Sequence, residues 1–142
     1  KIKSFGVSNF TASQMDMFKG KLNISYNQIN LSLTHLDHMF DGTLEYMQAN
    51  DILPMAYSPL GSYFNEENGK IKKVVDKLKN KYSCTDYQIL ISWLLKHPSK
   101  VYPVIGTTKS DRIKSTLESL KIEIDLIDWF ELLEASVGKR VP

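Results

Sequence analysis

Short apolar stretches alternate with longer amphipathic ones along the whole chain. The short stretches are rich in β-branched and aromatic residues and predict strands over residues 2–7, 23–31, 52–57 and 101–105. In the longer stretches, apolar residues recur every three or four positions, as on one face of a helix. We expect helices after the capping pattern of Thr11 and Gln14, over 43–49, 71–82 and 85–97, after Ser110 or Asp111, and from Asp125.

The expected order of elements is β-α-β-α-β-(α-α)-β-α-α. Such alternation predicts a parallel sheet whose strands are joined by crossover helices. Two α/β architectures fit it, a small open sheet or half of an eight-unit barrel. Open-sheet dinucleotide binders usually have a G-x-G-x-x-G motif after their first strand, and this sequence lacks it. No shift in composition divides the chain, so we expect residues 1–142 to form a single domain.

Composition narrows the class of protein. Hydrophobic residues make up 42% and charged residues 24%, as in a globular protein, and no apolar run approaches the roughly 20 residues that span a bilayer. The net charge of +2 is too small to predict a nucleic-acid surface. Cys84 is the only cysteine, which favours a reducing cytoplasm. The chain opens at Lys1 directly into a strand, and we expect that its beginning has been removed.

Polar residues stand at or near the ends of the first two predicted strands. Ser8 and Asn9 have donors and acceptors that suit a planar carboxamide, although in an ordinary turn they would cap the next helix. Gln28 lies in an otherwise aliphatic strand and faces either solvent or a polar site, since burial without partners costs about 1–3 kcal/mol. Neither feature alone separates a ligand site from solvated polar residues.

The third and fourth strands end in loops with possible phosphate contacts. Tyr57 can stack on a planar heteroaromatic ring, and the loop 58–61 offers backbone N–H groups to phosphate oxygens. The alternative is a core tyrosine before an ordinary turn. The loop 106–109 leads into a helix start flanked by Lys109 and Arg112, where the helix dipole and two cations favour phosphate. The alternative there is a solvated helix start.

In this order and at these separations, GVSNF, NQINLS, AYSPLG and VIGTTKSDRI resemble the last four strand ends of the aldo-keto reductases. The resemblance covers the whole chain, and its longest stretch is most similar to a bacterial oxidoreductase branch of the family. It implies an α/β fold that is the C-terminal half of a (β/α)8 TIM barrel, namely strands 5–8 with their helices. It also implies NADPH as the cofactor, bound in extended form.

The resemblance further implies a role for each strand end. Ser8, Asn9 and Gln28 would hold the nicotinamide carboxamide, and Tyr57 would stack on its ring. The pyrophosphate would lie along Ser58, Leu60 and Gly61. The adenosine 2′-phosphate and its ribose would be surrounded by Gly106, Thr107, Thr108, Lys109 and Arg112. The two cations in this set favour NADPH over NADH.

Two stretches depart from the family pattern. Some members have a Lys-Ser pair where Gly106 and Thr107 stand, so here the phosphate contact rests more on the cations. Some have Glu and Asn against the adenine, where this chain has Ser115 and Thr116. Both changes leave the cations at the helix start as the main expected contacts.

The catalytic Asp, Tyr, Lys and His of the family come from its first four βα units, which have no counterpart in these residues. We therefore nominate no catalytic residue. Tyr26, Tyr63 and His35 are the candidates for substitutes, and we expect them to be packing or loop residues.

Two functions of different classes fit these expectations. The chain can be part of an NADPH-dependent oxidoreductase that reduces aldehydes or ketones to alcohols, inactive without its other half. Alternatively it is an NADPH-binding regulatory or interaction module; an open α/β binding protein is a third possibility. Half a barrel leaves strand edges and an apolar interior uncovered. We therefore expect a missing N-terminal half or a second copy as partner, besides a small carbonyl substrate, and neither nucleic acid nor membrane.

Overall fold

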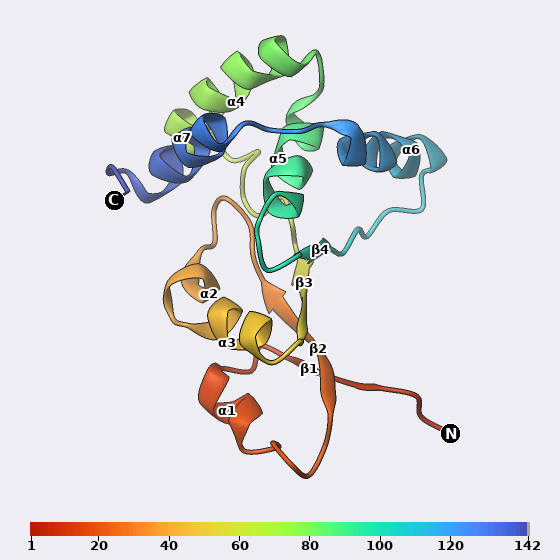
Figure 1. Ribbon diagram of the computed structural model, residues 1–142. Helices are drawn as coiled ribbons and strands as arrows, with labels where there is room; N and C mark the ends of the chain where they lie inside the picture. The colour runs from red at the N-terminus through yellow and green to blue at the C-terminus, as the bar shows by residue number, and fades with distance from the viewer. Residues whose placement is uncertain (142) are drawn as a thin grey trace.

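The computed structural model describes residues 1–141 and follows the expected alternation of strands and helices (Figure 1). The strands are β1 (Phe5–Ser8), β2 (Ile24–Asn30), β3 (Leu53–Tyr57) and β4 (Tyr102–Pro103). The helices are α1 (Ala12–Asp16), α2 (Asp37–Phe40), α3 (Thr43–Ala49), α4 (Gly69–Tyr82), α5 (Asp86–Leu95), α6 (Ser110–Glu118) and α7 (Leu126–Val137), with 3-10 turns at Glu66–Asn68 and Ser119–Lys121. The short helix α2 was not predicted.

The strands of residues 1–141 run parallel and lie side by side in chain order, β1-β2-β3-β4. An open doubly wound sheet reverses its order at a switch point, and the described residues contain no such reversal. Consecutive order is that of strands in a βα barrel. The chain therefore forms a partial α/β barrel; that it is the C-terminal half, and a single domain, stay predictions.

Both outer strands are shorter than predicted. β1 begins at Phe5 instead of residue 2, because its register starts at Ile24 of β2 and the preceding residues face no partner. β4 contains only Tyr102 and Pro103, since proline has no N–H for the ladder. The N–H of Val104 nevertheless donates to the carbonyl oxygen of Ala56 at 2.8 Å. Beyond Pro103, this bond continues the pairing of the chain with β3.

Two helices begin at capping boxes. The one at Thr11 was predicted as such, whereas Thr85 was expected only as a cap. Thr11 and Thr85 each accept a hydrogen bond from the backbone N–H three residues later, and the side chain of that residue, Gln14 or Gln88, accepts one in return. α1 has only five residues and ends before Phe18, which the predicted helix included. Phe18 still packs beside Phe10, with ring centroids 6.0 Å apart.

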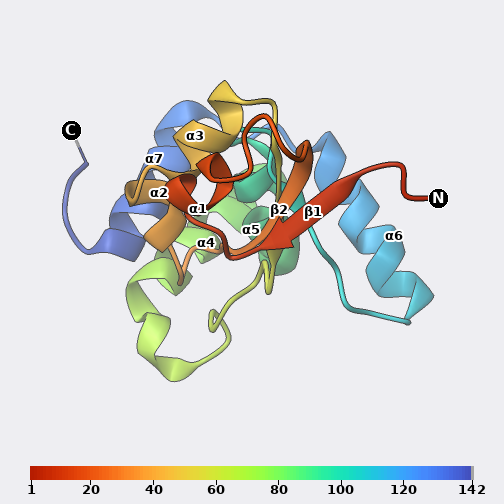
Figure 2. The ribbon, with the colours of Figure 1, turned by 90° about the horizontal axis from the view of Figure 1, so that it is seen from below.

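Helices cover one face of the sheet. Figure 2 shows α1, α2 and α3 gathered on one side of β1 and β2, with α6 apart from them. On the covered face, Ile29 and Ala56 are fully buried in the main core. On the opposite face, Tyr26 is 38% exposed and Tyr102 is 54% exposed. This exposed face corresponds to the interior of a barrel.

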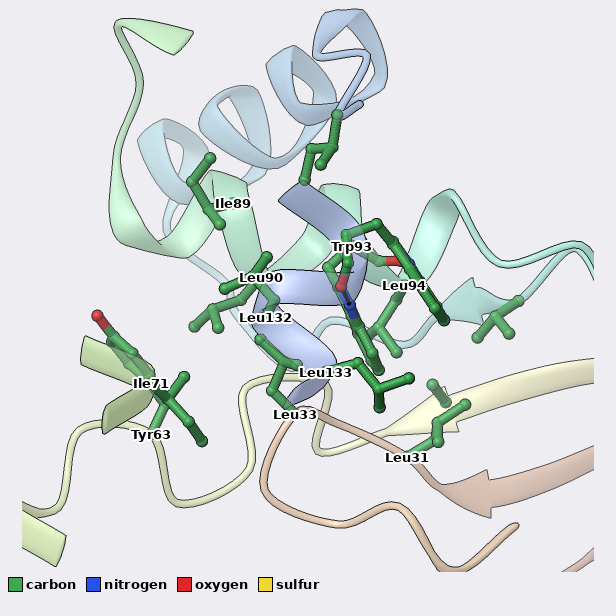
Figure 3. Packing of buried hydrophobic residues seen from close by; sticks show 14 of the residues in the cluster. Leu31, Leu33, Tyr63, Ile71, Ile89, Leu90, Trp93, Leu94, Leu132 and Leu133 are labelled. Atoms are coloured by element: carbon green, nitrogen blue, oxygen red, sulfur yellow. Dashed lines mark hydrogen bonds between the residues drawn. The ribbon is translucent and has the colours of Figure 1, made fainter. Parts of the chain in front are cut away.

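The main core joins the sheet to α4, α5 and α7 (Figure 3). Trp93 of α5 stacks on Trp129 of α7, with ring centroids 5.2 Å apart and planes at 10°. Each indole N–H donates to the backbone carbonyl of the other tryptophan, at 3.2 and 2.9 Å. This reciprocal pair fixes α7 against α5. Within residues 1–141, no helix has both the length and the apolar character needed to cross a membrane.

Candidate functional site

The carboxyl ends of the strands meet at one edge of the sheet because all strands are parallel. The register places Ser8 beside Gln28, and Asn30 beside Tyr57. Residues paired across strands point to the same face, and alternate residues of one strand share a face. These four side chains therefore belong to the face that the helices leave open.

Three of the predicted carboxamide-binding residues lie together. The backbone N–H of Asn9 and the hydroxyl of Ser8 both donate to the carbonyl oxygen of Gln28, at 2.8 and 3.1 Å. Asn9 has a φ of 55°, a left-handed conformation that asparagine tolerates well. Among residues 1–141, the half-buried side-chain amide of Gln28 has no hydrogen-bond partner. That amide is thus free to bind a ligand at this edge.

The loop after β3 is a tight turn with two left-handed residues. Ser58 has a φ of 49° and Gly61 a φ of 52°, and the N–H of Gly61 donates to the carbonyl oxygen of Ser58 at 2.8 Å. A Cβ at Gly61 would collide with the hydroxyl oxygens of Ser32 and Thr34 in the loop after β2. The resemblance assigned this glycine to the pyrophosphate, and the fold requires it for loop packing as well.

The loop after β4 has fewer contacts. The N–H of Lys109 donates to the hydroxyl of Thr107 at 3.2 Å, and a Cβ at Gly106 would meet nothing within 4 Å. The prediction that Ser110 or Asp111 caps α6 is wrong: Lys109 is the N-cap and makes no capping bond with its side chain. The hydroxyl of Thr107 accepts a hydrogen bond from the N–H of Lys109, and the helix begins at Ser110.

The two cations at this helix start are available to an anion. Lys109 and Arg112 are exposed, and in the part of the chain that the structure describes neither forms an ion pair. They adjoin the N-terminus of a nine-residue helix, where unpaired N–H groups and the helix dipole favour negative charge. The arrangement suits a phosphate monoester.

The two loops line a common cleft of about 270 Å³. Six of the predicted site residues line this cleft: Ser58, Leu60, Gly61, Gly106, Thr107 and Arg112. The other lining residues are Pro59, Tyr87, Val104 and Ile105. An adjoining cleft of about 650 Å³ shares Leu60, Tyr87 and Arg112 with it and extends to Phe64 and Ser115. Ser8, Asn9, Gln28, Tyr57, Thr108 and Lys109 line neither cleft. Six of the twelve predicted residues thus line the smaller cleft.

The two residues that depart from the family pattern differ in their surroundings. Thr116 lies 2.6 Å from the hydroxyl of Tyr87, oxygen to oxygen, and donates to the carbonyl oxygen of Arg112 at 2.8 Å. Its hydroxyl is therefore used inside the chain. Ser115 lines the larger cleft, and its carbonyl oxygen accepts a hydrogen bond from Gln88 at 3.1 Å.

Three residues near the site were not predicted. Tyr87 lies between the two clefts, and only its place in the first turn of a capped helix could have indicated it. Asn30 is in phase with Gln28, two residues further along β2, and its side-chain oxygen is buried with no hydrogen-bond partner among the described residues. Thr34 accepts a hydrogen bond from the loop after β3, a contact between distant segments that no sequence pattern could have indicated.

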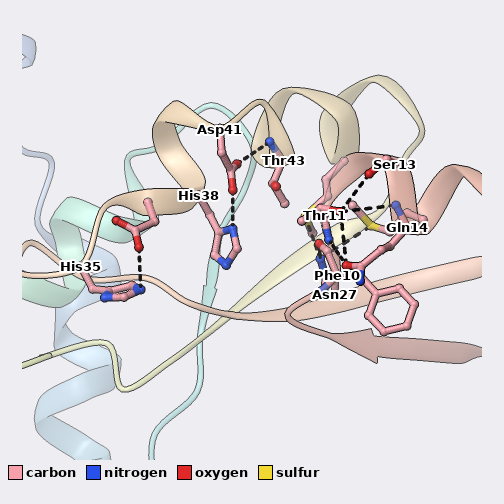
Figure 4. A network of polar contacts seen from close by, with 12 residues as sticks. Phe10, Thr11, Ser13, Gln14, Asn27, His35, His38, Asp41 and Thr43 are labelled. Carbon is pink, nitrogen blue, oxygen red and sulfur yellow. Dashed lines mark hydrogen bonds and ion pairs between the residues drawn. The ribbon is translucent and has the colours of Figure 1, made fainter.

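The candidate substitutes for catalytic residues lie in three different settings. Tyr63 is 3% exposed in the main core, where burial and the carboxylates of Asp86 and Asp76 raise its pKa to about 12. Tyr26 lies two residues before Gln28 on β2 and points to the same open face. His35 closes a turn and lies 3.7 Å from Asp37 (Figure 4). Tyr63 is thus a packing position and His35 a loop position, whereas Tyr26 is an exposed strand residue. That none of them is catalytic stays a prediction.

Other polar groups near the strand ends are occupied within the fold (Figure 4). The fully buried amide of Asn27 donates to the carbonyl oxygen of Phe10 at 2.8 Å. His38 contacts Asp41 at 3.0 Å, and the same carboxylate accepts from the N–H of Thr43 at 2.8 Å. Burial alone would raise the pKa of Asp41, but these hydrogen bonds outweigh it and lower that pKa. No group of His, Cys, Asp and Glu in residues 1–141 could hold a metal ion.

These donors fit a phosphorylated dinucleotide. The free amide of Gln28 suits a carboxamide, the open space at Gly106 admits close approach of a ligand, and the cations suit a phosphate. Ligand clefts of proteins commonly measure 300–1,000 Å³. The larger cleft falls in this range, and the smaller one lies just below it.

Comparisons with known proteins identify the family and the fold. The family model described as "Aldo/keto reductase family" matches residues 1–136. A 6-dehydroglucose reductase of Agrobacterium fabrum is 34% identical over 99% of the chain, and the oxidoreductase YdhF of Escherichia coli is 30% identical over 100%. The crystal structure of the thermostable aldo-keto reductase Tm1743 superimposes with a TM-score of 0.85 at 26% identity, over 94% of this chain and 48% of its own. The chain spans about half the length of these relatives, 49% and 50%.

Proposed function

The chain belongs to the aldo/keto reductase family, and on this premise we propose that it supplies the cofactor-binding half of an NADPH-dependent oxidoreductase. The reaction is the reduction of an aldehyde or ketone to an alcohol. The observation that supports this most directly is the shared cleft: loops that lie more than forty residues apart, 58–61 and 104–107, line it together with Arg112. Enzymes of the family generally use a nicotinamide cofactor.

Each group of residues has a task in this proposal. Ser8, Asn9 and Gln28 hold the carboxamide and so orient the nicotinamide, against which the ring of Tyr57 packs. The cleft between the loops receives the pyrophosphate, and Lys109 and Arg112 bind the 2′-phosphate. Because NADH has no 2′-phosphate, two free cations there favour NADPH. When bound, NADPH supplies the hydride of the reaction.

The chain is proposed to be the C-terminal half of the barrel, with its open face and its strand edges covered by a partner. β1 and β4 each have one unpaired edge within residues 1–141, and Tyr26 and Tyr102 expose apolar surface that a barrel would enclose. The partner is the N-terminal half or a second copy of this chain. Sedimentation of the isolated chain tests this, and a well-folded monomer would contradict it. A cytoplasmic location is part of the same proposal.

The test of function compares this chain alone with the completed barrel, meaning the chain joined to the four βα units that the proposal places before it. We expect carbonyl-dependent oxidation of NADPH by the completed barrel only, followed by the absorbance of the reduced nicotinamide. Turnover by the 142-residue chain alone would contradict the proposal. Binding of NADPH by the completed barrel without turnover would favour the regulatory module instead.

A further inference from the structure

We propose that Thr34 is a positioning residue for the cofactor, acting through the loop after β3. Its hydroxyl and that of Ser32 form a seat, the hydroxyl seat, that holds residues 58–62 in the shape that lines the cleft. This inference rests on the proposed function, because the loop matters for catalysis only if a dinucleotide lies along it.

The hydroxyl seat contacts the loop through one direct hydrogen bond and through close packing. The N–H of Ser62 donates to the hydroxyl oxygen of Thr34 at 2.9 Å. That oxygen lies 3.2 Å from the hydroxyl of Ser32, which also accepts from the N–H of Thr34 at 3.2 Å. Gly61 rests against both hydroxyls so closely that even a methyl group would collide with them. The two loops therefore interlock.

The turn 58–61 needs such support from outside. Ser58 and Gly61 both have left-handed φ angles, 49° and 52°. This conformation is unfavourable for serine and persists only where the surroundings impose it. The internal bond from Gly61 to Ser58 closes the turn but does not orient it toward the cleft. Leu60 and the adjacent Tyr63 pack on the main core, and Thr34 adds a polar contact from the loop after β2.

The hydroxyl seat is itself firmly held. Ser32 is fully buried, and it exchanges two backbone hydrogen bonds with His35, both at 3.1 Å. Leu31 and Leu33 on either side belong to the main core. The hydroxyl of Ser136 in α7 donates to the carbonyl oxygen of Leu33. The seat is thus fixed by the sheet and by α7, and it positions the loop before any ligand arrives.

Loss of the Thr34 hydroxyl should therefore have a characteristic signature. The turn 58–61 is proposed to lie along the pyrophosphate, which NADPH and NADH have in common. A variant that releases this turn should weaken both nucleotides by the same factor. Loss of a 2′-phosphate contact such as Arg112 should weaken NADPH alone.

The experiment measures the dissociation constants of NADPH and NADH by nucleotide fluorescence on the completed barrel. We expect Thr34→Val to raise both constants by about three- to tenfold, the usual effect of one lost hydrogen bond. Thr34→Ser keeps the hydroxyl and should stay within about twofold of the wild type on the same basis. Ser119→Ala is the control: Ser119 is buried, and its hydroxyl forms no hydrogen bond with the described residues.

A second readout separates failure of this inference from failure of the proposed function. Amide hydrogen exchange at Ser62 should become faster in Thr34→Val and should be unchanged in Thr34→Ser. If exchange is faster but both dissociation constants are unchanged, or if Thr34→Ser weakens binding as much as Thr34→Val, the positioning role is wrong. If the wild type binds neither nucleotide, the proposed function fails and the positioning role with it, while the exchange data still report whether the seat exists.

Discussion

The loops after β3 and β4 line the same cleft but are built in opposite ways. Residues 58–62 are clamped: Gly61 has no room for a side chain, and Ser62 is bonded to Thr34. Residues 104–109 form few hydrogen bonds with other elements, chiefly that of Val104 to Ala56, and Gly106 has open space around it. In the proposed site, the clamped loop serves the part shared by all nicotinamide dinucleotides. The open loop serves the phosphate that distinguishes NADPH.

This difference illustrates how one cleft separates affinity from selectivity. A preorganised loop binds without first losing conformational freedom, so it adds affinity for any ligand that fits it. An open loop with free cations discriminates by charge and can adapt to the phosphate that it meets. The clamped loop depends on packing, and the open loop depends on side-chain charge. Substitutions of matched residues in the two loops test this contrast.

Gly61→Ala should have the largest effect on stability. The added Cβ would collide with the hydroxyls of Ser32 and Thr34, at a φ that disfavours alanine. We expect the free energy of unfolding to fall by about 3 kcal/mol, from overpacking together with backbone strain. Urea denaturation measures it, with Gly106→Ala as the control that should change stability by no more than about 0.5 kcal/mol. Equal losses in the two variants would remove the contrast between the loops.

Arg112→Leu should have the next largest effect, and on binding instead of stability. Hydrogen bonds to charged groups contribute about 1.5–3 kcal/mol, so the dissociation constant of NADPH should rise at least about tenfold. The constant for NADH should change little, because NADH has no phosphate at that position. Lys114→Met, which removes an exposed cation further along α6, is the control. A parallel loss for both nucleotides would mean that Arg112 does not read the 2′-phosphate.

His97 should make the free energy of unfolding sensitive to acid, through the segment that leads into β4. It precedes β4, and its ring accepts from the N–H of Ser99 at 3.2 Å. Burial lowers its pKa, against a smaller opposing effect of the Glu45 carboxylate. The unfolded chain therefore binds the proton more readily, and stability is lost as the pH falls below the ordinary value of about 6.5.

His97→Gln keeps an acceptor for Ser99 but cannot take up a proton. The unfolding free energy of this variant should vary less between about pH 6.5 and pH 5 than that of the wild type. Chemical denaturation across this range measures the slope. If the unfolding free energies of the variant and of the wild type depend equally on pH, groups other than His97 cause the dependence.

Thr107→Val should have the smallest effect. Among the described residues, its hydroxyl forms the one side-chain hydrogen bond of residues 104–109, with the N–H of Lys109. Because this bond joins two residues of one loop and ties the loop to no other element, we expect a stability change within about 0.5 kcal/mol. Urea denaturation of Thr107→Val and Thr34→Val under the same conditions compares their free energies of unfolding. A loss as large as that of Thr34→Val would show that the open loop is also held by its hydroxyl.

Local patterns predicted most elements because their causes are local. The helix over 43–49 has the predicted bounds, and the capping pairs of Thr11 and Thr85 mark helix starts as expected. Strand lengths were less predictable, since β4 has a neighbour on only one side and contains Pro103. The N-cap of α6 was missed because a hydroxyl two residues earlier, on Thr107, serves the free N–H.

The order of the motifs by itself determined the family and the alternation of strands and helices, since both depend on residue types at fixed separations. It also placed the candidate residues at strand ends. Only the tertiary structure decided which of them share a cleft, and that Gly61 is confined by hydroxyls from another loop. Such contacts depend on strand register and on the depth of loop packing, which join residues that are distant in the chain. The clamped loop is therefore a property of the fold, whereas the sequence alone indicates the cations at and just after the open loop.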